Sequence, residues 1–151
     1  MRHDLTIFIL LLVTLPILSQ GPERTVPGAS TQDGFGRELS GAGDLNGDGY
    51  PDLWVGETHG DSSLGIDTGL VHPLDGRTGT IIRTIEPASA QGTFFTDLEG
   101  LGDVTGDGTP DLLVGSPDVR DAQGNAFAAA VYSGATGAFF RGYGTAPIAI
   151  N

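Results

Sequence analysis

Short apolar segments recur along the chain, separated by runs rich in glycine, aspartate and proline. This alternation predicts two sets of four short strands. The predicted strands span residues 35–42, 52–58, 69–74 and 80–85 in the first set and 94–101, 111–116, 126–132 and 138–141 in the second. Residues 53–55 and 112–114 are apolar throughout, so these strands carry apolar side chains on both faces and need cover on both sides. The pattern therefore predicts small sheets stacked on one another.

The two sets are copies of one unit. Residues 34–56 and 93–115 share many positions at a spacing of 59, and residues 74–83 and 132–141 match at a spacing of 58. A repeat of about 60 residues implies one supersecondary unit used twice. Four-stranded antiparallel sheets repeated around an axis make a β-propeller, and two such blades cannot close the ring. We therefore expect an all-β fold of two propeller-type blades, an incomplete propeller.

Each unit contains an acidic loop between its first two strands. Oxygen-bearing side chains occupy loop positions 1, 3, 5 and 9, and position 7 offers a backbone carbonyl. The candidate metal ligands are Asp44, Asn46, Asp48, Tyr50 and Asp52 in the first loop and Asp103, Thr105, Asp107, Thr109 and Asp111 in the second. A calcium ion takes six to eight such oxygens, and the glycines beside positions 3 and 5 allow the positive φ that a tight curl requires. The alternative is a pair of Asp/Gly turns with solvated carboxylates.

Residues 34–141 resemble the FG-GAP repeats of integrin α subunits and of many exported bacterial proteins. Phe35-Gly36 stands at the FG position, residues 44–52 match the calcium loop of the family, and Gly56-Glu57-Thr58 stands at the GAP position. In the second unit Phe94-Phe95 replaces FG, whereas Gly115-Ser116-Pro117 is closer to GAP. The resemblance implies a propeller blade with structural calcium in its first hairpin. Because Thr105 replaces the usual Asp or Asn, it also implies a weaker second site.

The charge of the chain excludes one class of partner. Formal net charge is −12, with nineteen acidic residues against seven arginines, so the chain lacks the cations needed to neutralise nucleic-acid phosphates. Cysteine is absent, so no disulfide can hold the domain together, and bound metal is a natural substitute.

The N-terminus predicts export. Arg2 and His3 precede an apolar run, residues 7–15, and Ser19 suits the position before a cleavage site, so residues 1–19 are predicted to be a signal peptide. The run is short for a stable membrane span, although an uncleaved anchor is an alternative. The remaining divisions are a linker or stray strand (20–33), repeat one (34–92), repeat two (93–144) and a truncated tail (145–151). Either the chain is a fragment, or its blades assemble with further blades.

The sequence supports an EF-hand or a catalytic site less well than it supports the calcium loops described above. An EF-hand requires Glu at loop position 12, where Val55 and Val114 stand. No nucleophile–base arrangement is recognisable, His59 is expected to be exposed, and Glu57 is expected to be solvated, so catalysis is not expected. Trp54 is expected to pack within the fold.

The sequence thus predicts a secreted or cell-surface, calcium-binding module for adhesion, recognition or scaffolding, with a protein or glycan as partner. Two alternatives stay open: accessory blades of a larger secreted hydrolase, and a carbohydrate-binding propeller.

Overall fold

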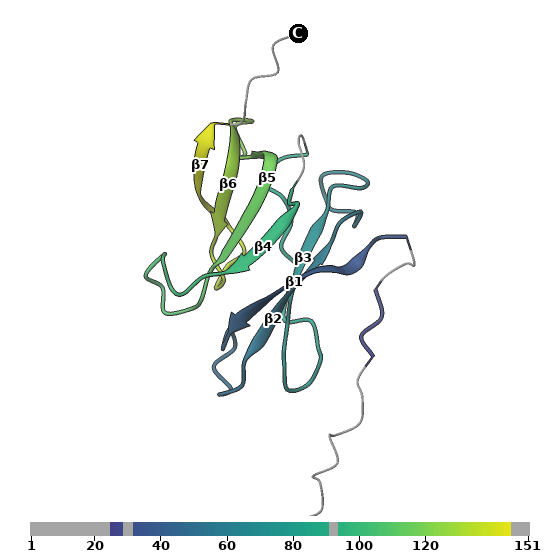
Figure 1. The fold of residues 1–151 in the computed structure, drawn as a ribbon, viewed down its shortest axis with the longest axis vertical. Helices are drawn as coiled ribbons and strands as arrows, with labels where there is room; N and C mark the ends of the chain where they lie inside the picture. The colour runs from purple at the N-terminus through teal and green to yellow at the C-terminus, as the bar shows by residue number, and fades with distance from the viewer. Residues whose placement is uncertain (1–24, 29–31, 91–93, 146–151) are drawn as a thin grey trace, which may run out of the picture.

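Figure 1 shows a computed structural model of the chain, in which residues 25–28, 32–90 and 94–145 are described. The regular elements in these residues are all β-strands, as the sequence predicts. The predicted signal peptide lies outside the described residues, and so does the predicted tail apart from residue 145. The predicted stray strand is not seen at residues 25–28 or 32–33. In the described part of the chain, no helix is long and apolar enough to cross a membrane.

The first blade is an antiparallel sheet in the order β1-β2-β3, formed by β1 (Phe35–Gly43), β2 (Asp52–Glu57) and β3 (Leu70–Leu74). The predicted fourth strand at 80–85 is present only as two isolated bridges, Leu74 with Ile81 and Val71 with Ile85. Between these bridges the outer segment has one residue more than β3, which makes a bulge. Pro73 lies in the same interval and has no N–H to donate, so the ladder is interrupted there.

The second blade is a four-stranded antiparallel sheet in the order β4-β5-β6-β7. Its strands are β4 (Asp97–Gly100), β5 (Leu112–Arg120), β6 (Ala126–Tyr132) and β7 (Phe139–Thr145). β4 is shorter than predicted, because Phe94 and Phe95 leave the sheet and bury their rings in the core. β5 is longer than predicted and pairs up to Arg120 with Ala126, so only residues 121–125 of the expected 117–125 loop form a turn.

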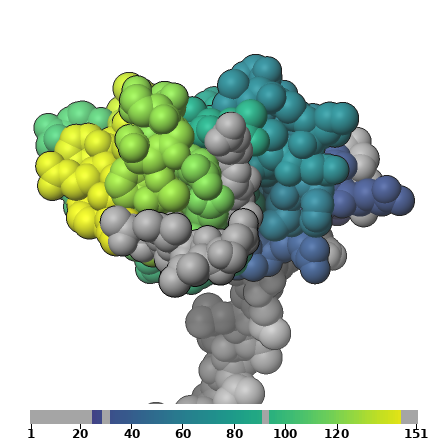
Figure 2. Space-filling view, turned by 90° about the horizontal axis from the view of Figure 1, so that it is seen from above, coloured from purple at the N-terminus to yellow at the C-terminus, as the bar shows by residue number. Residues whose placement is uncertain are grey.

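The two blades stack face to face, and the core lies between them. Figure 2 shows the second blade, in light green and yellow, beside the first, in blue and teal. The buried cluster at this contact draws on both sheets and includes Trp54, Val71, Leu98, Leu112, Val114 and Tyr132. The indole of Trp54 is fully buried, which confirms its expected packing role. Backbones also meet: a Cβ on Gly100 would lie 1.8 Å from the carbonyl oxygen of Gly41.

Candidate functional site

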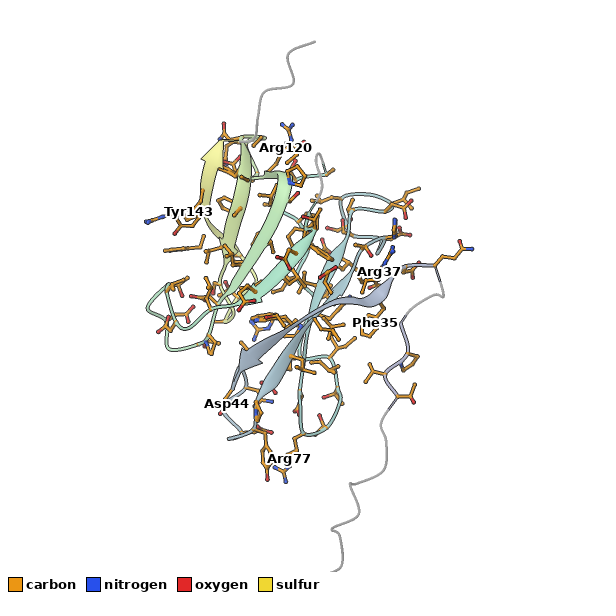
Figure 3. All side chains as sticks on the ribbon, in the orientation of Figure 1. Phe35, Arg37, Asp44, Arg77, Arg120 and Tyr143 are labelled. Carbon is orange, nitrogen blue, oxygen red and sulfur yellow. The ribbon has the colours of Figure 1, made fainter. Side chains whose placement is uncertain are left out.

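Each acidic loop connects the first two strands of its blade. The loop after β1 contains Gly47 and Gly49 with φ of 77° and 85°, and the loop after β4 contains Gly106 and Gly108 with φ of 81° and 88°. These left-handed conformations confirm the predicted curl, which a residue with a Cβ adopts only with strain. Figure 3 places Asp44, the first residue of its loop, at the same end of the first sheet as Arg77.

The first aspartate of each loop organises the curl. Asp44 Oδ1 accepts hydrogen bonds from the N–H groups of Gly47 (2.7 Å) and Asp48 (3.1 Å), and Oδ2 accepts one from Gly49 (3.0 Å). Asp103 does the same in the second loop: Oδ1 accepts from the fourth and fifth positions, at 2.6 and 3.0 Å, and Oδ2 from the sixth, at 2.8 Å. The two loops therefore share one hydrogen-bond pattern as well as one sequence pattern.

The last aspartate of each loop is buried and joins the loop to another hairpin. Asp52 is 1% exposed; its Oδ2 accepts from the N–H of Leu45 (2.8 Å) and its Oδ1 from that of Gly76 (3.0 Å). Asp111 is 0% exposed and binds Val104 and Gly134 in the corresponding way, at 2.8 and 2.9 Å. A buried carboxyl group that accepts several N–H bonds fixes the backbone groups around it.

Two residues that contact the loops were not predicted as site residues from the sequence. Asp75, at the turn after β3, accepts a hydrogen bond from Asn46 Nδ2 at 3.1 Å. Its repeat counterpart Ser133 donates its hydroxyl to Asp107 Oδ2 at 3.0 Å. The signal was present in the sequence, because Asp75-Gly76 and Ser133-Gly134 occupy the same repeat position.

Hydrogen bonds also lower the pKa of Asp75 and of Asp107. The backbone N–H of Thr109, followed by the Ser133 hydroxyl, holds the pKa of Asp107 below its ordinary value of 3.8, against the opposing effect of desolvation. The backbone N–H of Thr78 lowers the pKa of Asp75 in the same way. Both side chains therefore carry negative charge next to the loops at neutral pH.

Position 5 makes the same contact in both loops, since Asp107 Oδ1 accepts from the N–H of Thr109 at 3.0 Å as Asp48 does from Tyr50, but position 3 differs. Asp48 is exposed, and its Oδ1 accepts from the N–H of Tyr50 at 2.9 Å, while the ring of Tyr50 lies under the guanidinium of Arg77 at 5.0 Å. At position 3 of the second loop, Thr105 directs its hydroxyl toward Asp111 Oδ1 at 3.4 Å. In the first loop, Asn46 contacts the neighbouring turn through Asp75 and also its own loop, where its Oδ1 accepts from the N–H of Asp48 at 2.9 Å, whereas the Thr105 hydroxyl contacts its own loop.

The carboxylates, as placed, face backbone N–H groups. Among the described residues, no three acidic or histidine side chains converge as a metal-binding group. The donor set itself fits a hard cation, because every side-chain candidate offers oxygen. A carboxylate has about four lone-pair positions, so one that accepts N–H bonds can still coordinate a cation.

Two segments of the chain, residues 35–72 and 99–133, match the family model of the FG-GAP repeat. Each segment includes one acidic loop together with strands of one blade. This chain is an FG-GAP repeat protein. FG-GAP repeats occur in β-propeller modules of adhesion and recognition, and the two stacked sheets agree with such blades without closing a ring. No curated protein matches the chain.

A second polar cluster of this FG-GAP protein lies away from the acidic loops. Glu57 was expected to be solvated, but it is 3% exposed, and its Oε2 lies 2.7 Å from His72 Nε2. The other ring nitrogen of His72 lies 3.2 Å from the hydroxyl of Thr84. Glu57 is buried because β2 turns its side chain onto the face where the ring of Phe35 packs against the imidazole of His72, with the ring centroids 5.6 Å apart. The expectation that Glu57 is solvated was therefore wrong.

Proposed function

We propose that this chain is a calcium-stabilised, non-enzymatic module of an exported protein and serves adhesion, recognition or scaffolding. The observation that carries the proposal is the repetition of one acidic loop, with one hydrogen-bond pattern, at the same place in both blades. A turn needed only for chain reversal does not require acidic side chains at three matched positions. Repeated carboxylates at 1, 5 and 9 are costly unless a cation offsets their mutual repulsion.

The ligands would be the side chains of Asp44, Asn46, Asp48 and Asp52 with the carbonyl of Tyr50, and those of Asp103, Thr105, Asp107 and Asp111 with the carbonyl of Thr109. A bound calcium supplies positive charge at the loop and links it to the strands on either side. Its binding free energy then adds to the stability of the fold. We expect the second loop to bind more weakly, because the Thr105 hydroxyl is a poorer ligand than a carboxamide and already contacts Asp111.

The absence of enzymatic activity is part of the proposal. The acid–base pair Glu57 and His72 is inaccessible to a substrate: the two residues are 3% and 5% exposed and bind each other. The other described histidine, His59, is exposed in the segment after β2. Export rests on residues 1–19, and removal of this segment at Ser19 during secretion is the expected outcome of N-terminal sequencing of the secreted protein.

Thermal melting in millimolar calcium and in excess chelator tests the calcium proposal. Calcium should raise the melting temperature, and Asp48→Ala should remove most of the increment contributed by the first loop. Asp61→Ala is a matched control, because Asp61 is also exposed and its Oδ1 also accepts one backbone N–H at 2.9 Å. The control variant should keep the full calcium increment. Identical melting curves in calcium and chelator for the unaltered chain would refute the proposal.

A further inference from the structure

The two blades stack in the same orientation, so different faces of the repeat meet. We call the side of each sheet that carries Trp54 or its counterpart Leu113 the front face, and the opposite side, with Leu53 or Leu112, the back face. Trp54 on the first blade and Leu112 on the second are both 0% exposed at the contact. Ser40, which pairs with Trp54 across the ladder, accepts a hydrogen bond from the N–H of Gly100 at 2.9 Å. The front of blade one therefore covers the back of blade two.

The front face of blade two carries an apolar groove of about 370 Å³. Six residues line it: Leu101, Val104, Leu113, Ala129, Val131 and Tyr143. At the repeat spacings of 59 and 58, these correspond in order to Ala42, Leu45, Trp54, Val71, Pro73 and Ile85. Every one of these counterparts is buried on the front face of blade one. The groove is thus the second copy of a surface that the fold covers once.

The exposed fractions show the difference between covered and uncovered copies. Tyr143 is 46% exposed where its counterpart Ile85 is 1% exposed, and Figure 3 shows Tyr143 on the side of the second sheet away from the first. Val104 is 52% exposed where Leu45 is 8% exposed. Large apolar side chains exposed together mark a surface that binds another protein surface.

The back face of blade one shows the complementary exposure. Leu53 is 40% exposed, whereas its counterpart Leu112 is 0% exposed against the first blade. Leu39 is 60% exposed, whereas its counterpart Leu98 is 4% exposed. The chain therefore exposes one front face, on blade two, and one back face, on blade one. These are the same two kinds of surface that meet between the blades inside the chain.

We propose that the front face of blade two binds the back face of blade one from a second copy of this chain, in a head-to-tail arrangement. The contact would repeat the one that joins the two blades within the chain. This contact depends on blade packing and not on calcium binding, so its test is independent of the test of the proposed function.

The contact between the two blades also includes an arginine, and its repeat counterpart is expected to make the same polar contact between two copies of the chain. Arg83 Nη1 reaches from blade one to the turn of blade two and donates to the carbonyl of Gly134 at 2.7 Å and to that of Ala135. Arg141 stands at the same repeat position on blade two and is exposed, with its guanidinium 5.4 Å from the ring of Phe140. In the second copy, the counterpart carbonyls are those of Gly76 and Arg77. Arg141 is therefore expected to donate to them across the interface.

A front-to-back contact is heterologous, so each added copy exposes a new front face and a new back face. Such a series ends only when it closes. Propellers close with about four to eight blades, which corresponds to about two to four copies of a two-bladed unit.

The test uses one variant for each face. Leu113→Glu places a charge on the front of blade two, and Leu53→Glu places one on the back of blade one. Sedimentation equilibrium of the purified chain should show self-association that each variant abolishes. Mixing the two variants should restore association, but only as a one-to-one heterodimer, because each retains the face that the other has lost. Arg141→Ala should weaken self-association about tenfold.

Ile66→Glu is the control, because Ile66 is 79% exposed in the segment between β2 and β3 and belongs to neither matched set. It should associate as the unaltered chain does. Far-UV circular dichroism and melting temperature establish that the variants remain folded. Three outcomes would overturn the proposal: an unaltered chain that stays monomeric at millimolar concentration, a mixture of variants that stays monomeric, or a Leu53→Glu variant that still associates with itself. The first of these would point to a further repeat of a longer chain as the occupant of the groove.

Discussion

The carboxylate of Asp111 accepts a hydrogen bond from the backbone N–H of Gly134, 23 residues further along the chain, at 2.9 Å. This bond joins the acidic loop of the second blade to the turn between its last two strands. Asp52 and Gly76 make the same bond in the first blade at 3.0 Å. The ninth residue of each loop is therefore a structural residue of the blade as well as a candidate ligand.

Asp111→Ala is expected to destabilise the fold even when no calcium is present. The substitution leaves the N–H groups of Val104, Thr105 and Gly134 without their acceptor, which should cost about 3 kcal/mol. Urea unfolding in chelator measures this loss. The exposed residue Asp61 provides the comparison: Asp61→Ala should change the free energy of unfolding by less than about 1 kcal/mol. Equal losses for the two variants would contradict the structural role.

Gly134→Ala should be poorly tolerated, because a Cβ there would lie 1.7 Å from the carbonyl oxygen of Pro110. The acidic loop and the turn would have to separate, at a cost of at least about 2 kcal/mol. Gly102→Ala is the matched control, since a Cβ on Gly102 meets nothing within 4 Å. Its effect should stay within about 0.5 kcal/mol. Chemical denaturation of both variants checks the contrast, and similar stabilities would show that the close approach is unimportant.

His72→Ala should destabilise the first blade by about 3–5 kcal/mol, because it removes the partner of the buried Glu57 carboxylate. The second blade indicates a remedy, since Ser116 and Ala130 stand at the positions of Glu57 and His72. The double variant Glu57→Ser/His72→Ala should therefore be more stable than His72→Ala alone. A double-mutant cycle measured by urea unfolding gives the coupling between the pair. Additive effects would mean that Glu57 and His72 contribute independently.

Asp121 should make the stability of the chain sensitive to acid. Hydrogen bonds from the side chain and then the backbone of Asn125, with one from Gln123, lower the pKa of Asp121 below 3.8 in the folded state. Because the folded-state pKa is the lower one, this stabilisation is present above pH 3.8 and is lost as the pH falls through the folded pKa.

The variant Asp121→Ala should accordingly melt below the unaltered chain at pH 7, and the gap should narrow toward pH 3. Gln123→Ala keeps the backbone donor and should show the pH dependence of the unaltered chain. Melting curves at a series of pH values measure the difference in melting temperature between each variant and the unaltered chain. A gap that is constant from pH 7 to pH 3 would rule out the ionised carboxylate as its source.

The repeat made most of this fold predictable from sequence. The matched loops, the alternation of apolar and turn residues and the all-apolar segments at 53–55 and 112–114 together predicted two stacked sheets. Local strand limits were less predictable, because they depend on contacts between the blades. Phe94 and Phe95 fit a strand by composition, yet the core between the blades draws both rings out of β4. Pro73 was visible in the sequence, but its effect on residues 80–85 depends on its coinciding with the bulge.

The candidate site was predictable in its residue types and only partly in its contacts. Loop positions 1 and 9 have different roles that their shared identity as aspartate hides: Asp44 is exposed and binds its own loop, whereas Asp52 is buried and reaches Gly76. That difference arises because the ninth residue lies beside the adjoining turn: Asp52, the first residue of β2, is buried there, and Asp111, just before β5, is buried in the same way. Glu57 was misassigned because its partner His72 lies on another strand and becomes a neighbour only through the register of β2 with β3.

The front-to-back stacking of the blades has a consequence for how such chains grow. A surface that pairs with an unlike surface on the same unit is duplicated together with its complement whenever the unit is copied. A tandem duplication of one segment thus supplies a new blade and the means of attaching it, with no further substitution needed. Proteins of this kind can therefore grow by whole blades. The constraint on each addition is whether the first and last blades can still meet and close the ring.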